Sequence, residues 1–147
     1  MGARVERSDS EEATRAIGRR FGAGLRPGDV VGLVGPLGAG KTQFVKGIAA
    51  GLGVGDERRV NSPTFVLVQE YAGAVRLYHV DAYRLSGAKE LETVGFAEMC
   101  DRRGVVVVEW ADRVREAMPE STIWVQIEPA GERERRITIG GQWRDRS

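Results

Sequence analysis

The segment that most constrains this chain is GPLGAGKT at residues 35–42, which matches the pattern G-x-x-x-x-G-K-[ST]. In this pattern the glycines let successive backbone N–H groups turn toward phosphate oxygens. The lysine places a positive charge against the β- and γ-phosphates, and the hydroxyl that follows it binds Mg²⁺. The pattern predicts a nucleotide-phosphate site made by Gly35, Leu37, Gly38, Ala39, Gly40, Lys41 and Thr42.

The segments on either side of this phosphate loop support the prediction. Residues 29–34 form a short, mostly apolar run, which is typical of a buried parallel strand. Residues 43–52 carry apolar side chains at helical spacing. A strand, the loop and a helix in that order are the setting that a phosphate loop needs, and a plain glycine-rich turn would leave Lys41 and Thr42 unexplained.

Two acidic residues follow apolar strand-like runs, Asp81 after residues 77–80 and Glu109 after the valines of residues 105–108. Phosphate-loop proteins place a second Mg²⁺ contact at the end of such a strand. Both acids could belong to the surroundings of one Mg²⁺ together with Thr42, or one of them could orient the attacking water. For either acid alone, an exposed strand-end carboxylate is the alternative. The predicted catalytic residues are Lys41, Asp81 and Glu109, and the predicted metal-associated residues are Thr42, Asp81 and Glu109.

A loop with small hydroxyl side chains, Ser62-Pro63-Thr64, follows the expected phosphate-loop helix. Pro63 keeps its predecessor out of the helical region, which favours an ordered extended turn. Ser62 and Thr64 are therefore candidates for a switch segment that reaches the γ-phosphate or Mg²⁺. A turn that leads into a strand is the alternative.

The rest of the chain alternates between helical and strand periodicity. A helix is expected from an N-cap at Ser8 or Asp9 to about residue 24, and a contact between this helix and an adenine base is left open. The other expected elements are a hairpin over 65–71 and 75–81, short helices over 88–95, 96–103 and after 110, and closing strands over 122–127 and 135–139. The chain is thus expected to form a single α/β phosphate-loop NTPase domain over residues 1–147, with a mixed, mainly parallel central sheet flanked by helices.

The sequence leaves the roles of one histidine, one tryptophan and a group of arginines undecided. His79 shares a strand face with Asp81, which allows a site role, although a packed or surface histidine is favoured. Trp110 could stack on a nucleotide or a partner, or pack in the core. The arginines of residues 133–136, with Arg144 and Arg146, favour a solvated hairpin and tail, with a phosphate or RNA contact as the alternative.

Composition excludes several classes of protein. The chain has 147 residues, 41% hydrophobic and 29% charged, with a net charge of +1, so no global field favours nucleic acid or a membrane surface. The single cysteine, Cys100, excludes an internal disulfide and a multi-cysteine zinc site. No apolar run has the length of a membrane span, and residues 1–6 lack a signal-peptide pattern. A cytoplasmic protein without membrane contact is expected.

Five motifs occur in a specific order: GPLGAGKTQF, SPTF, HVDAYRL, LETVGF and VEW. Together they resemble the bacterial TsaE family, small ATPases of tRNA threonylcarbamoyladenosine biosynthesis, over about residues 11–139. The resemblance implies an ATPase that uses ATP and Mg²⁺, is weak alone and supports modification of the adenosine beside the anticodon together with the TsaB–TsaD pair. It also implies that tRNA is contacted only indirectly.

The resemblance also implies roles for particular residues. Residues 38–42 would hold the phosphates, and Thr42 with Glu109 would be the magnesium-associated pair. Asp81 would take the Walker B-like position, with Thr64 as the switch residue, Trp110 beside the site and Arg133 approaching the nucleotide. Pro36 and Asp112 depart from the family pattern, and neither removes a proposed ligand. A small phosphotransferase, and a nucleotide-dependent binding module without useful turnover, remain the alternatives.

Overall fold

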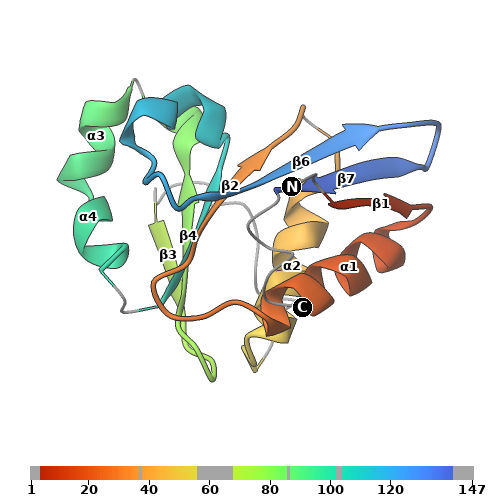
Figure 1. Ribbon diagram of the computed structural model, residues 1–147, viewed down its shortest axis with the longest axis horizontal. Helices are drawn as coiled ribbons and strands as arrows, with labels where there is room; N and C mark the ends of the chain where they lie inside the picture. The colour runs from red at the N-terminus through yellow and green to blue at the C-terminus, as the bar shows by residue number, and fades with distance from the viewer. Residues whose placement is uncertain (1–3, 37, 56–67, 86, 102–103, 141–147) are drawn as a thin grey trace.

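The protein folds around one seven-stranded sheet in the order β1-β7-β6-β2-β5-β4-β3 (Figure 1). The structure is a computed structural model that describes residues 4–36, 38–55, 68–85, 87–101 and 104–140. The strands are β1 Arg4–Ser8, β2 Val30–Val34, β3 Val68–Tyr71, β4 Leu77–Asp81, β5 Val105–Glu109, β6 Ile123–Pro129 and β7 Arg135–Ile139. The strands β6, β2, β5 and β4 run parallel, whereas β7, β1 and β3 join antiparallel. The expected mixed sheet with a parallel centre is confirmed.

Helices cover both faces of this sheet, as expected (Figure 1). On one face lie α1 (Glu11–Ala23) and α2 (Lys41–Gly51), which pack on alternate residues of the central strands. On the other face lie α3 (Ala88–Thr93), α4 (Phe96–Met99) and the 3₁₀ helices η2 (Ala82–Arg84) and η3 (Ala111–Ala117). Every residue of β5 is buried because a central strand with helices on both sides meets the core at each position. No described helix has an apolar stretch of the length that a membrane crossing needs.

Glycines bring α1 and α2 into direct backbone contact. A Cβ at Gly47 of α2 would lie 2.2 Å from the Arg15 carbonyl oxygen of α1, and one at Gly18 of α1 would lie 2.4 Å from the Phe44 carbonyl oxygen. Gly22 and Gly51 continue the same contact one turn further along each helix. Since α2 begins at the phosphate loop, this contact fixes the loop relative to the start of α1.

The N-terminal prediction is wrong in two details. The N-cap of α1 is Ser10, and not Ser8 or Asp9: the Ser10 side chain accepts a 3.0 Å hydrogen bond from the Ala13 N–H. Ser8 instead ends β1, a strand that was not expected, and its hydroxyl lies 2.7 Å from the Thr14 hydroxyl. The charged sequence of β1 hides its periodicity because this edge strand leaves most of its side chains exposed.

Loss of the Ser10 cap has a measurable cost. Ser10→Ala leaves the Ala13 N–H without its side-chain acceptor, so the free energy of unfolding is expected to fall by about 1 kcal/mol in urea denaturation. Asp9→Ala is the matched control and is expected to change stability by less than about 0.5 kcal/mol. Equal losses in the two variants would contradict the assignment of the cap to Ser10.

The remaining elements agree with the sequence within the described ranges. The hairpin is confirmed for β3 and β4, the short helices for α3, α4 and η3, and the closing strands for β6 and β7. Residues 65–67 of the expected hairpin and residues 102–103 of the expected helix lie outside the described residues. Arg144 and Arg146 also lie outside them.

Candidate functional site

The loop between β2 and α2 has the backbone that its glycines predict. Gly38 and Gly40 have φ values of 77° and 102°, a region that favours glycine because it lacks a Cβ. Gly40 is the N-cap of α2, so the first N–H groups of that helix face the loop rather than a capping side chain. Gly35 packs tightly on β6, where a Cβ would lie 2.4 Å from the Ile127 carbonyl oxygen. Leu37 lies outside the described residues. The loop is therefore shaped to present backbone N–H groups to an anion.

Lys41 lies with its ammonium group folded over this loop. Its Nζ donates hydrogen bonds to the carbonyl oxygens of Gly35 at 2.5 Å and Pro36 at 2.8 Å. The same Nζ lies 3.9 Å from the centroid of the Trp110 ring, a cation–π contact. Burial lowers the pKa of Lys41 below its usual value, against the opposing charges of Glu109 and Asp112. The loop and the indole therefore hold a weakly solvated cation beside the N-terminus of α2.

The two strand-end acids lie next to one another, which is compatible with the predicted role of both beside one Mg²⁺. Asp81 and Glu109 are register partners on the parallel strands β4 and β5, and their exposed fractions are 7% and 4%. Asp81 Oδ1 accepts a 3.0 Å hydrogen bond from the Tyr83 N–H, and Asp81 Oδ2 lies 3.6 Å from Arg84 Nε. Burial raises the pKa of Asp81, and the charge of Glu109 raises it further, while the Tyr83 N–H lowers it. Asp81 and Glu109 are both buried, so the alternative of an exposed strand-end carboxylate is wrong for each of them.

Glu109 also contacts the single histidine of the chain. His79 Nε2 lies 2.5 Å from Glu109 Oε2, and the His79 side chain is fully buried. The expected packed position of His79 is thus correct, but the sequence did not indicate its contact with a site carboxylate. Only the pairing of β4 with β5 brings these residues together, because they are far apart along the chain.

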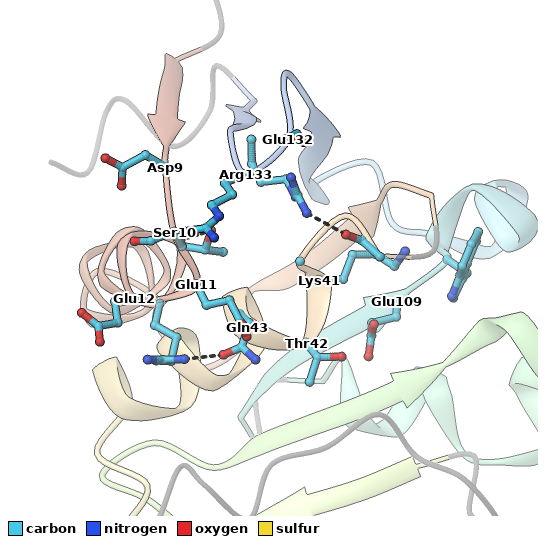
Figure 2. A pocket seen from close by; sticks show the side chains of 16 residues that line it. Asp9, Ser10, Glu11, Glu12, Lys41, Thr42, Gln43, Glu109, Glu132 and Arg133 are labelled. Carbon is cyan, nitrogen blue, oxygen red and sulfur yellow. Dashed lines mark hydrogen bonds between the residues drawn. The ribbon is translucent and has the colours of Figure 1, made fainter.

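Thr42 and Glu109 line one pocket together with Lys41 (Figure 2). The pocket has a volume of about 1060 Å³ and extends from the phosphate loop to the start of α1 and the turn between β6 and β7. Asp81 lies beside Glu109 but does not line this pocket. The volume is just above the range of about 300–1,000 Å³ for small-molecule and cofactor sites, so the pocket has room for a ligand of nucleotide size.

The donor set is compatible with Mg²⁺ bound together with a phosphate ligand. Thr42 offers a hydroxyl, and Asp81 and Glu109 offer carboxylates, all of them oxygen donors. Among the residues that the structure describes, no three His, Cys, Asp or Glu side chains gather as in an all-protein metal cage. Mg²⁺ at nucleotide sites needs no such cage, since phosphates and waters complete its shell.

Two arginines of the C-terminal hairpin reach this pocket. Arg133 lines it, which is compatible with its predicted contact with a nucleotide. Arg135, which sequence reasoning missed, donates from Nε to the Ala39 carbonyl oxygen at 3.0 Å and from Nη2 to the Gly38 carbonyl oxygen at 3.1 Å. Arg133 lies in the turn and Arg135 begins β7, so the only signal in the sequence was the cluster of arginines at residues 133–136. Arg135 thus tethers β7 to the phosphate loop.

Trp110 packs in the core, one of the two roles that the sequence left open, and its predicted stacking on a nucleotide or partner stays a prediction. It follows β5 with a φ of 61°, and its half-buried ring packs against the core under α3 and η3. Its ring centroid lies 4.8 Å from that of Tyr83, and the residue also lines the pocket. The predicted switch residues Ser62 and Thr64 lie outside the described residues.

This is a phosphate-loop α/β protein. It has a buried strand, then a loop in which Gly38 and Gly40 have positive φ, then a helix that starts at Lys41 and Thr42. The family model described as "Threonylcarbamoyl adenosine biosynthesis protein TsaE" matches residues 8–137. The chain belongs to the TsaE family.

Individual relatives agree with this assignment. A protein of Bacillus subtilis strain 168 named tRNA threonylcarbamoyladenosine biosynthesis protein TsaE is 45% identical over 90% of this chain and 82% of its own length. A Treponema pallidum protein of the same name is 41% identical over 90% of this chain and 96% of its own length. A crystal structure of Bacillus subtilis YdiB superposes with a TM-score of 0.78 at 35% identity, covering 97% of this chain and 90% of that one.

Proposed function

We propose that this protein is a Mg²⁺-dependent ATPase that supports threonylcarbamoyladenosine modification of tRNA, acting with the TsaB–TsaD pair. Membership of the TsaE family supports the pathway. The observation that carries the activity is the phosphate loop itself, with Lys41 held over it beside the N-terminus of α2. The partners and the hydrolysis are the expectations of the family resemblance.

The phosphates of ATP are proposed to lie in the glycine loop. Residues 38–42 would bind their oxygens through backbone N–H groups other than that of Ala39, which donates to the Pro36 carbonyl oxygen at 3.1 Å, aided by the positive end of α2. Lys41 would bind the β- and γ-phosphates with its third N–H while it keeps the Gly35 and Pro36 carbonyls as partners. Arg135 would hold the Gly38 and Ala39 carbonyls, which keeps these peptide groups in one orientation.

The carboxylates are proposed to act where the terminal phosphate would lie. Thr42 and Glu109 line the pocket and would hold Mg²⁺ directly or through water, with Asp81 behind them. A bound Mg²⁺ would supply positive charge that neutralises the phosphates during transfer to water. Either acid could instead orient the attacking water, and the burial of both keeps their charges close to the reacting phosphate.

The nucleoside is proposed to occupy the far end of the pocket. There the start of α1, with Ser10 and Glu11, faces the hairpin turn that carries Glu132 and Arg133 (Figure 2). Arg133 is the one predicted nucleotide contact at this end. An adenine base between these two walls would stay partly open to solvent, because the walls belong to a helix start and a turn.

The test is ATP hydrolysis by the purified protein, alone and with TsaB–TsaD. Wild-type protein should release phosphate to water, faster with the partners. Glu109→Gln should lower kcat by about 10²-fold while ATP still binds. Transfer of phosphate to a metabolite would support a small phosphotransferase. Full tRNA modification by Glu109→Gln would favour a binding module without useful turnover.

A further inference from the structure

We infer that His79 is the residue that positions the Glu109 carboxylate for its role at the terminal phosphate. This inference rests on the proposed ATPase function. Glu109 lines the pocket, whereas His79 lies behind it at zero exposure and does not line the pocket. His79 is therefore a positioning residue that acts through Glu109, and not one that touches the substrate.

The geometry of the two strands directs His79 at Glu109. On β4, His79 is the register partner of Val107 on β5, so Glu109 lies two residues further along the neighbouring strand. Such diagonal positions on one sheet face lie within reach of long side chains. The imidazole closes this gap with its Nε2 at 2.5 Å from Glu109 Oε2. Because a carboxylate oxygen only accepts, Nε2–H is the donor.

The contact holds one oxygen of a long side chain that has several rotamers. Glutamate has one more rotatable bond than aspartate, so the end of a strand alone does not fix its carboxylate. Asp81 receives its orientation locally, from the Tyr83 N–H two residues away. For Glu109 the corresponding donor comes from the neighbouring strand. With Oε2 held by His79, fewer orientations remain for Oε1.

The contact with Glu109 explains why a polar imidazole is buried at position 79. Within the described part of the chain, Nδ1 of His79 has no hydrogen-bond partner, whereas Nε2 is bound to Glu109. If the imidazole only filled space, an apolar ring of similar size would do so without burying an unsatisfied nitrogen. A buried polar side chain whose described hydrogen bond goes to a pocket carboxylate fits a positioning role.

The test compares His79→Gln with His79→Met. The two side chains have nearly equal length and volume, but only glutamine carries an N–H donor near the position of Nε2. His79→Met should lower kcat for ATP hydrolysis with TsaB–TsaD by about 10-fold or more. His79→Gln should retain most of the wild-type kcat, and both variants should keep the wild-type Kd for ATP. His79→Asn, whose amide is too short to reach Glu109, is the second variant and should behave like His79→Met.

The double variant separates positioning from a structural role. In the Glu109→Gln background, His79→Met should change kcat less than about twofold, because the carboxylate on which it acts is gone. Wild-type kcat in both His79→Met and His79→Asn would overturn the inference. So would an equal loss in His79→Gln and His79→Met, or the same loss in both Glu109 backgrounds. Absence of hydrolysis by wild-type protein would instead overturn the proposed function, and this inference with it.

Discussion

Lys41→Ala is expected to weaken ATP binding at least about 100-fold, because it removes the ammonium group that two loop carbonyls hold beside the N-terminus of α2. The ammonium is already desolvated and oriented by two loop carbonyls and the Trp110 ring, so little ordering cost remains when a phosphate binds. Isothermal titration with ATP and Mg²⁺ measures the change in Kd.

The control is Lys46→Ala, which removes the same charge from the same helix outside the pocket. It should leave Kd within about twofold of wild type because a charge at that distance is screened by solvent. Thermal unfolding should show that both variants are folded. Unchanged affinity in Lys41→Ala would contradict the assignment of the phosphate site to residues 35–42.

Gly47→Ala is expected to lower the free energy of unfolding by about 3 kcal/mol, and Tm by about 10 °C. In an unhindered helix this substitution would stabilise the protein by about 1 kcal/mol, so the predicted sign is the reverse of helix propensity. The reason is that the new Cβ would lie 2.2 Å from the Arg15 carbonyl oxygen and 2.9 Å from the Arg19 nitrogen. Both are backbone atoms, so α1 and α2 must move apart. Urea denaturation and thermal unfolding measure the loss.

The matched control is Gly87→Ala, at a position where a Cβ would meet no atom within 4 Å. Its backbone φ of 171° is extended, which alanine also adopts, so its stability should stay within about 0.5 kcal/mol of wild type. Because the helix that carries Gly47 begins at Lys41, the Gly47→Ala variant should also bind ATP more weakly. A Gly47→Ala protein as stable as wild type would contradict the close approach of the two helices.

Local sequence patterns predicted the parts of this protein whose structure is decided locally. Four consecutive valines at residues 105–108 are typical of a strand buried on both faces, and Gly38 and Gly40 adopt the positive φ values that favour glycine. The positions of Asp81 and Glu109 at strand ends also followed from their neighbours in sequence. Their side-by-side placement depends on the parallel pairing of β4 with β5, which only the structure shows.

Features that depend on distant pairings could not be predicted in the same way. The edge strand β1 is defined by its partner β7, and its charged sequence carries no apolar alternation. The contact of His79 with Glu109 requires the register of β4 on β5, which the sequence of either strand alone leaves open. Arg135 is far from the phosphate loop along the chain. It reaches the loop because β7 pairs with β6, and β6 pairs with β2, the strand that leads into the loop.

The most direct test of the proposed function is tRNA modification reconstituted over multiple turnovers from TsaB, TsaD, the threonylcarbamoyl donor, tRNA and ATP, with and without this protein. With wild-type protein, modified tRNA should accumulate well beyond one equivalent per TsaD. Without it, or with Lys41→Ala in its place, much less modified tRNA should accumulate. Equal multiple-turnover modification in the presence and absence of the protein would contradict the proposed function.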